Sequence, residues 1–180
     1  VDAIQNSTQR ALSATYALAA LVHQGQGRIA NFDAIASELI KVYPGADSLQ
    51  LAPGGITRQI VPLAGNEQGI GRNLLQDPLR NKEALRARDT GQLTLAGPFP
   101  LIQGGIGVVG RLPVFMNDSE GKPSFWGFAT VLIRYPEALE EARLDQLPQQ
   151  GIGYELWRVH PDSGKKQSIA ASSATPLVDP

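Results

Sequence analysis

GIGVVGRLPVFMNDSEGKPSFWGFATVLIR, residues 105–134, is the stretch that decides the fold of this chain. It contains two long runs of apolar, β-branched and aromatic residues, 105–116 and 124–134, separated by the polar segment 117–122. Runs of this composition joined by a polar turn are typical of antiparallel strands. A shorter run, 92–96, precedes them and is expected to be a strand as well. The stretch therefore predicts a three-stranded antiparallel meander.

The N-terminal segment 3–23 is predicted to be a helix, because small and apolar residues recur in it every three or four positions. These residues form a heptad-like seam: Ile4, Ser7, Ala11, Ala14, Leu18 and Leu21. Two interpretations of this seam are open. Either the helix packs on its own domain, or it is a stalk that pairs with the same helix of a second copy.

The other elements follow from helix caps, turns and apolar runs. Asn31 is predicted as the N-cap of a second helix, and Asp77 with Pro78 as the start of a third. In chain order we expect a helix over 31–43, a hairpin of strands 48–52 and 56–63, a helix over 77–89, the meander, a helix over 136–147 and a closing hairpin of strands 151–159 and 167–171.

The order of these elements predicts an α+β fold. We expect a long N-terminal stalk helix, then a PAS-like antiparallel sheet with flanking helices on one side, and a smaller C-terminal α/β segment. The absence of a repeated strand–helix alternation argues against a doubly wound sheet or a TIM barrel.

Composition limits the classes of function. The 180 residues suit one globular domain, or one domain with a smaller appendage, and a net charge of −1 argues against a nucleic-acid-binding domain. The absence of Cys excludes disulfides, a thiol nucleophile and Cys-based metal sites. Two distant histidines, His23 and His160, argue against a His-rich metal centre. We therefore expect no metal, no cofactor and no nucleic-acid partner.

The ends of the sequence carry no predicted membrane segment. No uninterrupted apolar run reaches about 18 residues, and the run 11–22 lacks the basic leader of a signal peptide. The sequence begins at Val1 without Met, which fits either a processed or recombinant protein or a segment of a longer protein, and we expect the segment.

One motif has to be interpreted in its context. Residues 105–110 match the dinucleotide-binding pattern G-x-G-x-x-G, which requires a helix directly after the glycines. Here Pro113 and its β-branched and aromatic neighbours predict a strand instead. The glycines are expected to mark bulges or close approaches to the backbone. No other catalytic motif is present, so no catalytic residue is assigned and the chain is not expected to be an enzyme.

A set of short segments carries a family resemblance. In order they are LAPGG (51–55), VP (61–62), GRNL (71–74), LRARDTG (85–91), GPFPL (97–101), GVV (107–109) and RLPVF (111–115). Together they resemble the CHASE domains, which are extracytoplasmic sensory domains of membrane receptors, including cytokinin-receptor histidine kinases and bacterial cyclases and phosphodiesterases. The resemblance covers roughly residues 45–135.

The resemblance implies a domain plan and a cellular setting. Residues 1–45 correspond to the stalk and second helix, 46–135 to a PAS-like ligand-sensing subdomain, and 136–180 to part of a membrane-proximal subdomain. The chain is then the periplasmic or extracellular portion of an inner-membrane protein, and it contacts the membrane only through flanking helices outside this sequence. A homodimer through the N-terminal helix and a small-molecule ligand are the expected partners.

The resemblance also implies candidate ligand contacts. In cytokinin-binding relatives the ligand lies between the sheet and the loop and helix that face it, and an acidic side chain bonds it. Asn73 occupies that position and carries no charge, so an adenine-like ligand does not follow from the resemblance. The expected pocket is lined by positions 73, 95, 101–104 and 125–130. The ligand-binding residues assigned are Asn73, Leu95, Leu101, Gln103, Gly104, Arg111, Phe125, Gly127 and Phe128.

Arg111 is the only charged residue between positions 90 and 117. If it faces the pocket, it favours a carboxylate or phosphate ligand. The alternative is an arginine that points outward or is paired within the structure. Beside the sensor hypothesis, two others remain: a dimerisation or protein-partner module without a small ligand, and a small hydrolase.

Overall fold

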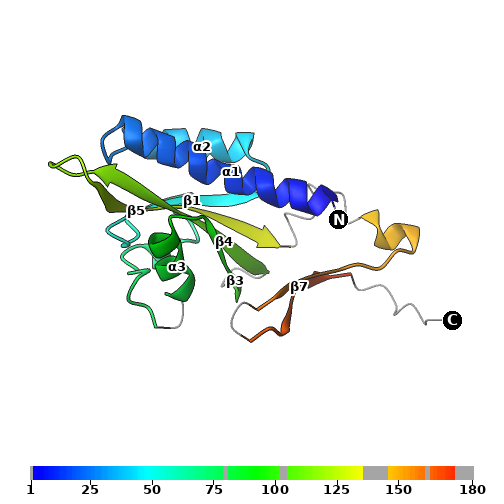
Figure 1. The fold of residues 1–180 in the computed structure, drawn as a ribbon. Coiled ribbons are helices and arrows are strands. Elements are labelled where there is room, and N and C mark those ends of the chain that lie inside the picture. Colours follow the sequence, from blue (N-terminus) through cyan, green and yellow to red (C-terminus); the bar gives the residue numbers. More distant parts are fainter. Residues whose placement is uncertain (1, 79–80, 102–104, 136–145, 161–162, 173–180) are drawn as a thin grey trace.

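The computed structural model describes residues 2–78, 81–101, 105–135, 146–160 and 163–172 (Figure 1). Its elements in chain order are α1 (Asp2–Gln24), α2 (Phe32–Val42), β1 (Ala46–Pro53), β2 (Gln59–Val61), the 3-10 turn η1 (Glu67–Gly69), α3 (Lys82–Thr90), β3 (Thr94–Pro100), β4 (Ile106–Asn117), β5 (Pro123–Tyr135), the 3-10 turn η3 (Pro148–Gln150), β6 (Glu155–Val159) and β7 (Lys166–Ala171). The predicted α+β class is confirmed.

The strands form a five-stranded antiparallel sheet in the order β2-β1-β5-β4-β3, and a separate two-stranded sheet, β6-β7. The predicted meander is β3-β4-β5, and both predicted hairpins are present. The longest pairing joins β4 to β5, because the runs 105–116 and 124–134 are both long and rich in apolar, β-branched and aromatic residues. The helix predicted over 136–147 falls mainly on residues outside the described ranges.

Two predicted helix starts differ in detail from the structure. The third helix begins after Asn81 and not at Asp77, because the backbone N–H of Asp77 donates to the Asn73 carbonyl and residues 73–77 turn back on themselves. The second helix begins after Asn31 as expected. However, Asn31 adopts a left-handed conformation, with φ of 52°, and its side chain makes no capping hydrogen bond.

Helices α1 and α2 cover one face of the five-stranded sheet (Figure 1). Four of the six seam residues, Ser7, Ala11, Ala14 and Leu18, are buried, and the three apolar ones belong to the core that α1 shares with the sheet. The strands contribute Leu49, Leu51, Val114, Val131 and Ile133 to this core. The seam is thus buried against the chain's own sheet, as one of the two interpretations predicts.

Helix α3 lies on the opposite face of the sheet, which corrects the prediction that all helices lie on one side (Figure 1). Its small residues Ala84 and Ala87 pack against Phe128 of β5 and Ala52 of β1. This second core is small, and it fills only the part of the face next to α3. Residues of the segment 65–74, which follows β2, lie over the neighbouring part of this face.

Two glycines of the G-x-G-x-x-G match make room for side chains on the two faces of β4. A Cβ at Gly110 would come within 2.4 Å of Leu12 of α1, and a Cβ at Gly107 within 2.8 Å of Leu101. The strand continues through Pro113 without a helix, so the motif has a packing role and the predicted strand is confirmed.

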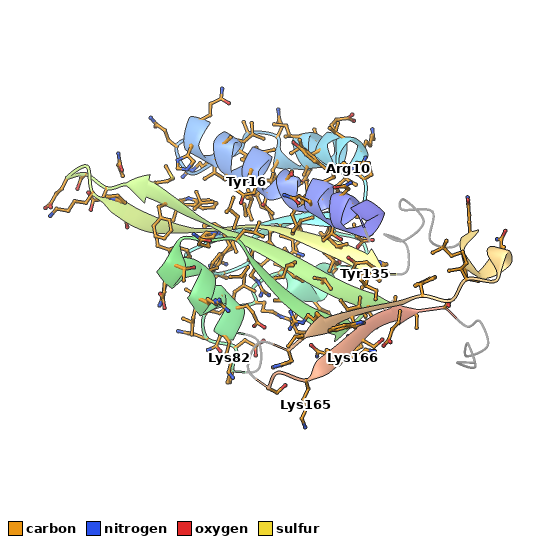
Figure 2. All side chains as sticks on the ribbon, turned by 45° about the vertical axis from the view of Figure 1, so that its right-hand side comes forward. Arg10, Tyr16, Lys82, Tyr135, Lys165 and Lys166 are labelled. Carbon is orange, nitrogen blue, oxygen red and sulfur yellow. The ribbon has the colours of Figure 1, made fainter. Side chains whose placement is uncertain are left out.

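The β6-β7 hairpin lies beside the N-terminal half of α1 and leaves a groove between them, which we call the α1 groove. Its volume is about 1110 Å³, and Leu12, Tyr16, Leu95 and Trp157 line it. Tyr135 lies between α1 and the hairpin (Figure 2), and its hydroxyl is 3.2 Å from Thr8 Oγ1. Among the described residues, no helix has the length and apolar character needed to span a membrane.

Candidate functional site

A row of polar residues crosses the sheet on the face opposite α1. Gln50 of β1 is the direct partner of Thr130 of β5, and Thr130 is the direct partner of Arg111 of β4. Residues directly opposite each other in a ladder point to the same face. The neighbouring row on this face, formed by Leu132 and Val109, is apolar. The sheet thus offers a polar line beside an apolar one.

This row forms the floor of a cavity of about 320 Å³, which we call the sheet cavity. The segment after β1 forms its roof, and the end of β3 closes one side. The described lining residues are Gln50, Thr57, Ile60, Gly65, Asn66, Gln68, Gly69, Arg72, Leu74, Phe99, Pro100, Leu101, Val109, Arg111, Thr130 and Leu132. The volume lies within the range of small-molecule sites in proteins.

Backbone hydrogen bonds hold the roof over the sheet. The N–H of Gly71 donates to the Thr57 carbonyl at 2.8 Å, and the N–H of Thr57 donates to the Arg72 carbonyl at 3.0 Å. The N–H of Leu74 donates to the Gly55 carbonyl at 2.8 Å. Because these bonds tie two separate parts of the segment together, the roof is preformed and is not a free loop.

The lining of the sheet cavity is cationic. Arg111 of the floor is 5% exposed and lines the cavity. Arg72 adds a second, exposed guanidinium on the roof. Among the described lining residues there is no aspartate or glutamate. Arg134 lies on the same face outside the cavity and forms a two-pronged ion pair with Asp47, with Nε–Oδ1 and Nη2–Oδ2 distances of 3.0 and 3.1 Å.

Thr130 contributes a buried hydroxyl to the floor. The residue is 1% exposed, and its Oγ1 has no hydrogen-bond partner among the described residues. A buried hydroxyl without a partner costs about 1–3 kcal/mol. A polar group on a ligand in the cavity is in a position to remove that cost.

The structure brings two of the predicted site residues together. Leu101 and Arg111 both line the sheet cavity. Asn73 lies next to the lining residues Arg72 and Leu74, but its side-chain oxygen accepts the N–H of Leu75 at 3.1 Å and so holds the local turn. Gln103 and Gly104 lie outside the described residues.

The other four predicted residues lie elsewhere. Leu95 is 38% exposed and lines the α1 groove on the opposite face of the sheet. Phe128 and Phe125 stack edge-to-face, with ring centroids 5.0 Å apart, in the core next to α3. Gly127 lies against β1, since a Cβ there would be 2.2 Å from the Ala52 carbonyl oxygen. A close approach of two strands, not of a ligand, accounts for this glycine.

Several lining residues were not assigned from the sequence. Gln50 and Thr130 each carry a signal, because each is a polar residue directly between two apolar neighbours of its strand. Thr130 falls inside the expected range 125–130, whereas Gln50 and Thr57 come from segments for which no contact was expected. Among the described residues, no three acidic, Cys or His side chains cluster so as to hold a metal ion.

Comparisons with known proteins agree with these observations. The CHASE domain family model matches residues 30–168. The fold is similar to that of an extracellular ligand binding receptor from Desulfohalobium retbaense DSM5692, with a TM-score of 0.59 and 19% sequence identity over 78% of this chain. The present chain corresponds to 25% of that receptor chain. No curated protein matches the sequence. The family match covers most of the chain, and CHASE domains are extracytoplasmic sensory domains, so this chain belongs to the CHASE domain family and is an extracytoplasmic sensory domain.

Proposed function

We propose that this chain is the ligand-sensing domain of a bacterial transmembrane signalling receptor and that it binds a small molecule in the sheet cavity. The observation that carries the proposal is the polar row Gln50–Thr130–Arg111 on the floor of the sheet cavity. Within this row the buried Thr130 hydroxyl has no hydrogen-bond partner among the described residues, a cost that a polar group of a bound ligand removes.

The proposal extends to the parent protein. The receptor is expected to be anchored in the inner membrane, and its output domain is a histidine kinase or a cyclic-di-GMP cyclase or phosphodiesterase. Residues 1–45 then form the stalk and second helix, 46–135 the sensing subdomain, and 136–180 the beginning of a membrane-proximal subdomain. The chain itself carries no reaction in this scheme, and the catalytic step belongs to the output domain.

The signal reaches α1 through the sheet. Only a ligand with different affinities for two arrangements of the domain can shift their populations. The cavity floor and the α1 core are opposite faces of the same strands, so a change in the sheet acts on α1 directly. We extend the proposal to a homodimer formed through the exposed side of α1 that borders the α1 groove, where Tyr16 is 57% exposed. Sedimentation analysis of the chain and of Tyr16→Glu tests this part, since a dimer through this face should dissociate in the variant.

A thermal-shift screen of the purified chain with small metabolites tests the binding proposal. A ligand at about 100 times its dissociation constant adds about 2.7 kcal/mol, a rise of roughly 5–10 °C for a chain of this size. The shift should disappear in Val109→Phe, which fills the sheet cavity, and remain in Leu93→Phe, which lies in the α1 groove. A ligand that stabilises both variants equally binds elsewhere and contradicts the proposal.

The α1 groove supports a second candidate function, a dimerisation or protein-partner module without a small ligand. Exposed large apolar residues gather there, including Tyr16, Leu95 and Trp157. Apolar patches of this kind often mark interaction sites. If no metabolite shifts the unfolding temperature while Leu93→Phe prevents self-association, this candidate replaces the sensor proposal.

A further inference from the structure

We infer that the sheet cavity takes a small monoanionic carboxylate with a short apolar body, and that it discriminates against neutral amides, amines and zwitterions. This inference rests on the proposed function, because it names the ligand class of the same cavity. Three features carry it: the charge of the lining, the donors on the floor and the apolar row beside them.

The charge of the lining favours an anion. Arg72 and Arg111 are its charged members, and no described lining residue is acidic. Guanidinium groups bind carboxylates through charge-assisted hydrogen bonds, and an anion in the cavity lies next to both arginines.

The donors on the floor suit a carboxylate. The hydroxyl of Thr130 lies on the strand next to Arg111, directly opposite it in the ladder, and has no hydrogen-bond partner among the described residues. A guanidinium donates two parallel hydrogen bonds and a threonine hydroxyl donates one. Two oxygens on one planar group can accept from both side chains, whereas a neutral amide has only one accepting oxygen and turns an N–H toward a cation.

The walls suit an apolar body of limited length. Val109 and Leu132 form the apolar row beside the polar one, and Leu101 and Phe99 close the side. A cavity of about 320 Å³ is at the small end of ligand sites, so it accepts a molecule of roughly the size of a phenyl or hexyl acid and excludes long acyl chains.

An α-amino group works against binding here. An ammonium requires an anionic or strongly accepting partner, and the described lining provides only neutral oxygens, such as those of Gln50, Asn66 and Gln68. The guanidinium groups of Arg72 and Arg111 also repel the positive charge of an ammonium group. The cavity should therefore prefer an acid to the amino acid that has the same body.

The test is calorimetric titration of the purified 180-residue chain with matched probes. The probes are 3-phenylpropionate, its primary amide, phenylalanine, hexanoate and inorganic phosphate. We expect at least one of the two acids to bind, and the amide and phenylalanine to bind at least ten-fold more weakly than 3-phenylpropionate. Equal binding of acid and amide overturns the inference, as does binding of phosphate alone.

Three variants identify the site of binding. Arg111→Met should weaken acid binding at least ten-fold, and Thr130→Val, which keeps the side-chain shape, about five-fold. Arg134→Met is the matched control, because it removes an arginine from the same face outside the cavity, and it should bind like the unmodified chain. Thr130→Val keeps the test decisive if Arg111→Met does not fold, since an unchanged affinity in Thr130→Val contradicts the inference.

Failure of the inference is distinguishable from failure of the proposed function. Binding of neutral or cationic probes that Val109→Phe abolishes overturns the anion preference and leaves the sensor proposal intact. If no probe binds and no metabolite of the thermal-shift screen stabilises the chain, both are wrong.

Discussion

The two faces of the central sheet use alternate residues of the same strands and have opposite characters. On the α1 face, Val131 is fully buried among aliphatic side chains of α1 and the strands. On the other face, Thr130 is equally buried but lines a cavity and leaves its hydroxyl without a partner among the described residues. Exposure alone does not separate a core residue from a site residue. The two kinds of residue are distinguished by the chemistry of their neighbours and by whether side chains fill the space around them.

The comparison also shows where stability resides. The α1 face has a continuous aliphatic core, and only the part next to α3 is closed in the same way on the other face. Close-packed interiors provide most of the stabilisation of a domain, whereas a cavity forgoes part of it. Substitutions on the two faces should therefore differ in their effect on the free energy of unfolding, and the following predictions test this difference.

The largest effect is expected for Leu18→Ala on the α1 face. Leu18 is fully buried, and truncation leaves a void among α1 and the strands, which costs about 3 kcal/mol. Leu101→Ala, at the half-buried wall of the sheet cavity, should cost less than half as much. Urea unfolding followed by tryptophan fluorescence measures both. Equal losses would contradict the difference between the faces.

A smaller effect is expected for a pair of isosteric exchanges at adjacent positions. Val131→Thr places a hydroxyl in the aliphatic core and should lower the free energy of unfolding by about 2 kcal/mol. Thr130→Val removes a buried hydroxyl that has no partner among the described residues, so it should leave the stability unchanged or raise it. Differential scanning calorimetry without ligand compares them. A loss in Thr130→Val as large as in Val131→Thr would show that the hydroxyl is already satisfied.

An effect of about 1 kcal/mol is expected for Asp47→Asn. The Arg134–Asp47 pair is mostly shielded from solvent, with side-chain exposures of 15% and 27%, and both prongs are hydrogen bonds. The difference between the chain and the variant should shrink in high salt. Denaturation at low and high salt measures it, and a salt-independent loss would indicate packing rather than charge.

The smallest effect at neutral pH, about 0.5 kcal/mol, is expected for Tyr135→Phe, which removes the bond to Thr8. Burial raises the pKa of Tyr135 above its ordinary value of 10.0, and the bond to Thr8 offsets part of this. Above about pH 10 the unfolded chain therefore loses this proton first, so stability falls as the pH rises through this range. The variant should lose less stability there. Parallel pH profiles of the two proteins would contradict this assignment.

Much of the fold is predictable because the strands carry long apolar runs. The runs 105–116 and 124–134 predicted β4 and β5 to within one residue at all four ends. The start of α3 was not predictable from its cap signal, since Asp77 is used by a turn anchored at Asn73. The face that α3 covers was not predictable either. Its buried residues, Ala84 and Ala87, are small and suit either face of a sheet.

The candidate site was predictable only where a residue is unusual in its own segment. Arg111 qualifies, as a single charge within an apolar strand. Leu95 was assigned to the pocket, but the register of β3 shifts between Ala96 and Phe99. As a result, Leu95 faces the α1 groove while Phe99 faces the sheet cavity. Gln50 becomes a neighbour of Arg111 only through the pairing of β1 and β4 with β5, which local sequence does not contain.

Strand β5 lies between the sheet cavity on one face and α1 on the other. One peptide bond joins Thr130, which borders the cavity, to Val131, which borders α1. An occupant of the cavity and the helix are therefore separated by the thickness of a single strand. In the proposed mechanism, communication between them requires no relay of side chains, because a change in the twist of β5 acts on both neighbours at once.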